Sequence, residues 1–154
     1  MSQYYDMGGQ TLWNPSNGVS RLFMSQVSAH QAELGVPSGI GPMQADECQI
    51  DPLVFTTFVD ALLAWHRGTG HAVMAALSEG FVATVLVLAE RAGIEVNGQP
   101  PGSAGFGDVG DVKDVQVGQV GQVGQVGQAT ASPEQAREAA LQRKARELSR
   151  SMAA

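Results

Sequence analysis

The 154-residue chain has one cysteine, few aromatic residues and no excess of basic charge. Because Cys48 has no partner within the chain, an internal disulfide is impossible, which excludes a disulfide-stapled secreted scaffold. The formal net charge of −6 argues against a general nucleic-acid-binding protein, whose phosphate contacts need clustered cations. No basic segment followed by an apolar run opens the chain, so we expect no signal peptide and a cytoplasmic location.

Long apolar runs are also missing. The candidate run, residues 81–89, is uncharged throughout, but a membrane-spanning helix needs about 20 apolar residues. Glu79 precedes this run and Glu90 follows it. We therefore expect no membrane span.

The composition changes near residue 97 and divides the chain into three segments. Residues 1–96 carry 3 basic and 9 acidic side chains and most of the large apolar residues, which predicts one helical globular domain. Residues 97–131 are rich in Gly, Val, Gln and Pro and contain uninterrupted Val-Gly-Gln triplets from 117 to 128. We interpret them as a flexible low-complexity linker, with a self-associating strip as the alternative. Residues 132–154 are predicted to form an amphipathic helix.

The fold class predicted is mainly α. It has a three-helix core with a short N-terminal β-hairpin, a disordered Gly/Val/Gln linker and a detached C-terminal amphipathic helix. The hairpin occupies residues 2–13 around the turn-forming pair Gly8–Gly9. Helices are expected at residues 16–34, 52–67 and 71–92, with an irregular crossing segment at 35–50. The buried stripe of the first helix is predicted to be Val19, Leu22, Phe23, Val27, His30 and Leu34.

The third helix is apolar around most of its circumference, which is typical of a helix in the middle of a bundle. The C-terminal helix begins at a capping box formed by Ser132 and Gln135, with Pro133 at its first position. Its apolar stripe is too narrow to be stable without a surface to pack on. The helix could dock on its own domain, on a copy of the chain or on another protein, or remain loosely helical.

Signatures of enzyme chemistry are absent from the sequence. It contains no phosphate-binding loop, no dinucleotide fingerprint, no nucleophile elbow and no zinc-protease motif. We therefore assign no catalytic residue, no cofactor and no metal. The only weak candidates for metal ligands are His66, His71 and Glu79, near the junction of the second and third helices, and histidines at such a junction are more often capping or surface residues.

Anchors for a protein partner are easier to find. Large aromatic and apolar side chains dominate interface energies when they enter a pocket, although they also fill cores. The candidate partner-binding residues are Trp13, Trp65, Leu141, Leu148 and Met152.

Two resemblances to known families arise. The runs Leu12-Trp13-Asn14-Pro15-Ser16-Asn17, Leu34-Gly35-Val36 and Glu90-Arg91-Ala92-Gly93 resemble a group of small uncharacterised actinobacterial proteins over residues 1–96. That group has no assigned activity and transfers no site. The run Trp65-His66-Arg67-Gly68 is similar to the Trp-x-Gly turn of small type VII secretion substrates, but its spacing is one residue longer and no export signal follows.

The function expected from these observations is non-enzymatic. The chain is predicted to be a protein–protein interaction or assembly module with a tethered docking helix, binding a protein partner or forming a homo-oligomer. The alternatives are a toxin-neutralising, immunity-like protein, a small metal-dependent enzyme using the junction at His66 and His71, and a structural component assembled through its Val-Gly-Gln strip.

Overall fold

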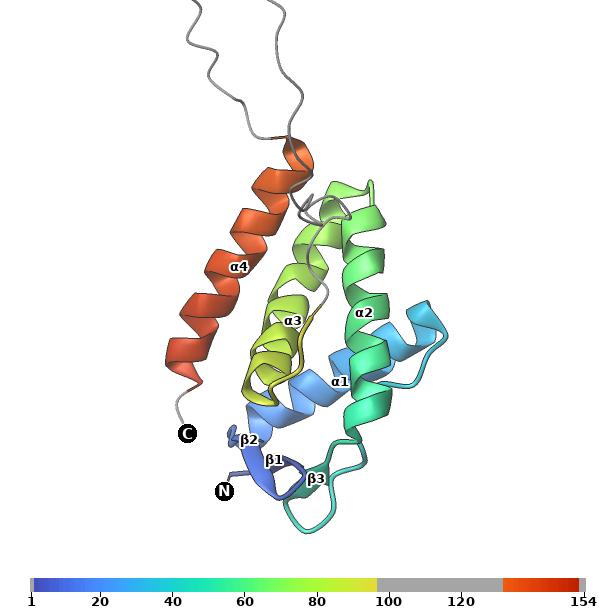
Figure 1. The fold of residues 1–154 in the computed structure, drawn as a ribbon. Helices are drawn as coiled ribbons and strands as arrows, with labels where there is room; N and C mark the ends of the chain where they lie inside the picture. The colour runs from blue at the N-terminus through green and yellow to red at the C-terminus, as the bar shows by residue number, and fades with distance from the viewer. Residues whose placement is uncertain (1, 97–131, 153–154) are drawn as a thin grey trace, which may run out of the picture.

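The structure is a computed structural model that describes residues 2–96 and 132–152. The elements in chain order are β1 (Tyr4–Met7), β2 (Gln10–Trp13), α1 (Asn17–Leu34), β3 (Glu47–Gln49), α2 (Pro52–Gly68), α3 (Ala72–Arg91) and α4 (Pro133–Ser151). The fold is mainly helical with a small N-terminal sheet, as predicted (Figure 1). The predicted linker and its Val-Gly-Gln repeats lie outside the described residues.

The helix ends follow from local capping chemistry. At the start of α2, the Asp51 carboxylate accepts a hydrogen bond from the Val54 amide at 2.9 Å, and Pro52 occupies the first helical turn. At the start of α4, the predicted capping box between Ser132 and Gln135 is formed in both directions. These signals lie within a few residues of each other, so they could be identified from the sequence.

The predicted hairpin is present, and it gains a third strand that the sequence analysis missed. The strand order is β2-β1-β3, with β3 parallel to β1, so the crossing segment is not irregular throughout. Strand β3 has only three residues, too few to show a hydrophobic alternation. Its entry turn places Ala45 and Asp46 at positive φ, an unusual conformation for residues other than glycine.

The core lies where α1, α2, α3 and the sheet meet. The rings of Tyr5, Phe23 and Phe81 pack in series, with centroids 5.6 Å apart at each step. The Tyr5 hydroxyl and the Ser20 hydroxyl are 2.6 Å apart and satisfy each other in this buried setting.

Helix α1 presents a different side to the core from the one predicted. Phe23 and Val27 are buried as expected, but Val19 and Leu22 are exposed. The buried side is rotated toward Ser20, whose polar side chain hid it from a search for apolar spacing. Val19 and Leu22 therefore lie at the edge of the core, on the surface.

Helix α3 runs through the centre of the molecule, as its apolar circumference predicted. Within the described residues it is the one helix long and apolar enough to cross a membrane, and its run from Phe81 to Ala89 is largely buried in the protein. Such burial is typical of a core helix in a soluble protein. Its N-terminal half differs, because Val73, Met74 and Leu77 are exposed.

Helix α4 is detached from the domain in the sequence but not in space. It lies alongside α3 (Figure 1), where Leu141 and Met152 are buried. Polar contacts reinforce the packing. The Arg67 Nε atom lies 3.4 Å from Glu138 Oε2, and Arg91 donates to the backbone oxygens of Leu12 and Ser149 at 2.8 and 3.2 Å. The sequence left open what this helix packs on, and in the structure it packs on its own domain.

Candidate functional site

An apolar groove of about 520 Å³ opens between α1 and α4, and we call it the α1–α4 groove. Gly80 and Thr84 of α3 line it between the two walls. Helix α1 contributes Val19 and Leu22, and α4 contributes Lys144. Three of the predicted partner-binding residues also line the groove: Trp13, Leu148 and Met152.

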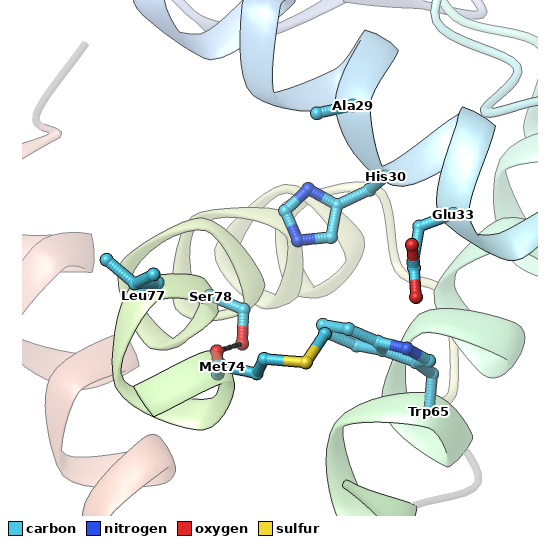
Figure 2. Close-up of a pocket in the computed structure, with 7 residues that line it drawn as sticks. All are labelled: Ala29, His30, Glu33, Trp65, Met74, Leu77 and Ser78. Carbon is cyan, nitrogen blue, oxygen red and sulfur yellow. Dashed lines mark hydrogen bonds between the residues drawn. The ribbon is translucent and has the colours of Figure 1, made fainter. Parts of the chain in front are cut away.

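A second, smaller cavity of about 230 Å³ lies between α1, α2 and α3, and we call it the Trp65 hollow (Figure 2). Leu77 and Glu33 stand on opposite sides of it, with His30 and Trp65 between them. His30 is held in place because its ring stacks on Phe81 with centroids 4.2 Å apart, and its Nδ1 lies 2.8 Å from the Gln26 carbonyl oxygen. The position of His30 in the hollow is therefore fixed by these two contacts.

The two cavities are parts of one surface. On α1, the groove and the hollow are lined by residues spaced alternately by three and four, which places them on one side of the helix. The same holds on α3. We call this surface the α1–α3 face. The lining residues that define it are Val19, Leu22, Gln26, Ala29 and Glu33 of α1 with Leu77, Gly80 and Thr84 of α3. Exposed Val73, four residues before Leu77, extends it along α3.

Large apolar side chains protrude from this face. Leu77 is 75 % exposed and Leu22 is 63 % exposed, and Val19 and Val73 are also exposed. Single exposed apolar residues are normal, whereas several beside two cavities make this face a candidate interaction surface. The two cavities differ in charge: Lys144 is the one charged residue lining the groove, and Glu33 is the one acidic residue lining the hollow.

The structure separates the five predicted partner-binding residues. Trp13 is mostly buried against Tyr5 and Phe23, and reaches the surface only at the end of the groove. Trp65 is half-buried in the hollow. Leu141 is buried where α4 packs on the domain, so its side chain serves the internal contact.

Leu22 and Leu77 were not expected at the surface, because Leu22 falls in the predicted buried stripe of the first helix and the third helix was predicted to be buried around most of its circumference. One signal could have identified them: α1 and α3 carry more apolar positions than one buried side of a helix can hold. Such an excess indicates that some apolar side chains lie on a second side of the helix, which is exposed to solvent in the isolated chain.

The weak metal candidates do not assemble into a recognisable site. Among residues 2–96 and 132–152, no group of three or more His, Cys, Asp and Glu side chains could hold a metal ion. His66 is buried, whereas His71 is exposed at the start of α3. The lone thiol, Cys48, is also buried, and burial raises its pKa to about 11, which disfavours the reactive thiolate.

His66 sits between α2, α3 and α4 without a hydrogen-bond partner for its Nε2 atom among the described residues. Burial lowers its pKa below the ordinary value of 6.5. The Ala75 carbonyl and the carboxylates of Glu79 and Glu138 favour the protonated ring, and Arg137 opposes it, but burial is the largest effect. The folded protein therefore favours the neutral form of the His66 ring over the protonated form.

This environment predicts a pH-dependent stability. The contribution of neutral His66 is present above pH 6.5 and is lost as the pH falls, because the unfolded chain then binds the proton more readily. Between about pH 7.5 and about pH 5.5, urea unfolding should show a steeper loss of stability for the native protein than for His66→Gln. The control His71→Gln should keep the native slope, and an unchanged slope in His66→Gln would contradict the prediction.

Comparison with known proteins places the chain in a family whose function is unknown. A search of curated proteins and a search of solved structures each gave no significant match. A family description matches the chain, and it covers residues 1–154. The family therefore includes the segment between α3 and α4 and α4 itself, and does not stop at the N-terminal domain. The chain belongs to the family described as "Family of unknown function (DUF6086)".

Proposed function

We propose that the protein is a non-enzymatic protein–protein interaction or assembly module of the cytoplasm, which binds through the α1–α3 face. The observation that supports this best is the exposure of Leu22 and Leu77 beside two apolar cavities. Apolar anchors next to pockets that can receive a partner's side chains are the arrangement found at binding hot spots.

The role of α4 in this proposal differs from the docking helix expected from the sequence. Because α4 packs on α3, it supplies one wall of the groove through Lys144 and Leu148. The helix then acts by completing the binding surface of its own chain. The N-terminal domain alone would lack this wall.

The proposal can be tested with matched leucine substitutions. Leu22→Glu and Leu77→Glu should reduce the amount of protein cross-linked to the full-length chain in native lysate by at least about tenfold, because each puts a charge on the binding face. Leu53→Glu is the matched control, since Leu53 is 81 % exposed on α2 and lines neither cavity.

The readout is quantitative mass spectrometry of the cross-linked species. Circular dichroism of each variant should show an unchanged fold, because all three leucines are largely exposed. Equal cross-linking by the native chain and by the two face variants would refute the proposal.

A further inference from the structure

We infer that the α1–α3 face binds the same face of a second copy of the chain across a two-fold axis. The inference rests on the proposed function and names its partner. In a two-fold contact each patch meets itself in reverse, so the face must be complementary to its own rotated image. The positions of the protruding leucines, the two cavities and the charged residues on the face meet this requirement.

The first requirement is that protruding side chains find cavities. Each half of the face has one cavity and one protruding leucine: Leu22 borders the α1–α4 groove, and Leu77 borders the Trp65 hollow. A two-fold axis through the middle of the face exchanges the halves. Leu22 of each copy then meets the hollow of the other, and Leu77 of each copy meets the groove of the other.

The second requirement is that the charges match after the exchange. Lys144 lines the groove in one half of the face. Glu33 lines the hollow in the other half (Figure 2). The rotation places Lys144 of one copy near Glu33 of the other, twice per dimer. A parallel arrangement would bring like charges together and is disfavoured.

The size of the face indicates a weak, reversible dimer. Along α1 it extends from Val19 to Glu33, which is about 21 Å at about 1.5 Å per residue. Across α1 the face is about one helix diameter wide, about 10 Å, and it continues onto α3, which α1 crosses (Figure 1). A patch of this size falls at the small end of specific interfaces, so the dimer should depend strongly on concentration.

The test is the mass of the full-length protein by sedimentation and light scattering over an about hundredfold range of concentration. The native chain should change reversibly from monomer to dimer. Leu22→Glu and Leu77→Glu should each weaken dimerisation by at least about tenfold, and the control Leu53→Glu should leave it unchanged.

A charge exchange gives the sharper test at low salt. Glu33→Lys and Lys144→Glu should each weaken the dimer several-fold, because each places like charges together twice. The double variant Glu33→Lys/Lys144→Glu should restore it, since opposite charges face each other again. No folding defect can produce that rescue.

Two results would overturn the inference: a chain that stays monomeric at every concentration, or a dimer that neither leucine variant weakens. If the chain is monomeric but the cross-linking to another protein still depends on Leu22 and Leu77, the second copy is wrong and the interaction module stands. If the chain is monomeric and its cross-linking to other proteins does not depend on Leu22 and Leu77, the proposed function fails as well.

Discussion

Replacing Leu141 with aspartate is expected to release α4 from the domain. Leu141 is the most deeply buried residue of α4, and truncating a buried leucine costs about 2–5 kcal/mol. Aspartate would in addition place a charged group in a buried contact that an apolar side chain now fills. Because isolated helices of this length are marginal in water, the released helix should also lose helicity.

Hydrogen exchange of the full-length chain measures this release. Amides of α4 should exchange close to the rate of an unfolded peptide in Leu141→Asp, and urea unfolding should show the lower stability. The matched control is Ala139→Asp, which places the same charge on the exposed side of α4 and should preserve the protection. Protected α4 amides in Leu141→Asp would show that the packing on α3 does not hold the helix.

Loss of α4 should also weaken binding through the α1–α3 face by at least about tenfold. Lys144, Leu148 and Met152 leave with the helix, so the α1–α4 groove loses one wall. Leu141→Asp should therefore dimerise as poorly as Leu22→Glu, although Leu141 itself is buried. This connects the stability of the fold to the proposed interaction.

Replacing Gly39 with alanine is expected to be strongly destabilising, by at least about 2 kcal/mol. Gly39 has a φ of +74°, and a Cβ atom there would lie 2.5 Å from the backbone nitrogen of Phe55. Its carbonyl oxygen accepts from the Asp51 amide at 2.8 Å, so the loop is attached to the start of α2. Backbone atoms cannot rotate away as a side chain can, and the loop or the helix must move.

The measurement is the free energy of unfolding in urea. Gly18→Ala is the contrasting control, because a Cβ at Gly18 meets nothing within 4 Å and the residue lies in α1. Alanine there should stabilise the protein by about 0.5–1 kcal/mol. Similar small effects at both positions would mean that the close approach of Gly39 to α2 is not maintained in solution.

The elements that could be predicted depend on neighbours in the sequence. The start of α2 at Asp51–Pro52 and the capping box at Ser132 are complete within a few residues. The hairpin turn at Gly8–Gly9 is equally local, and both residues have positive φ. Nothing distant is needed to form these features, so a single sequence contains enough information.

The candidate site could not be predicted from local sequence patterns, because contacts between distant residues determine which side chains are exposed. Leu22 and Val27 both belong to one apolar pattern on α1, yet only Val27 is buried. Val27 lies on the buried side of α1 with Ser20, whose hydroxyl contacts that of Tyr5 in β1, and Leu22 lies outside that side. The strand β3 was missed for a similar reason, since it exists only by pairing with β1.

By itself, the sequence determined the helical class, the helix ends, the hairpin turn and the apolar stripe of α4, because short-range capping, backbone preference and periodicity control them. Only the tertiary structure decided which side of α1 is buried, where α4 packs and which leucines remain in water. These outcomes depend on how residues far apart in the chain pack against one another in a core of limited volume. The apolar side chains of the α1–α3 face lie outside that core.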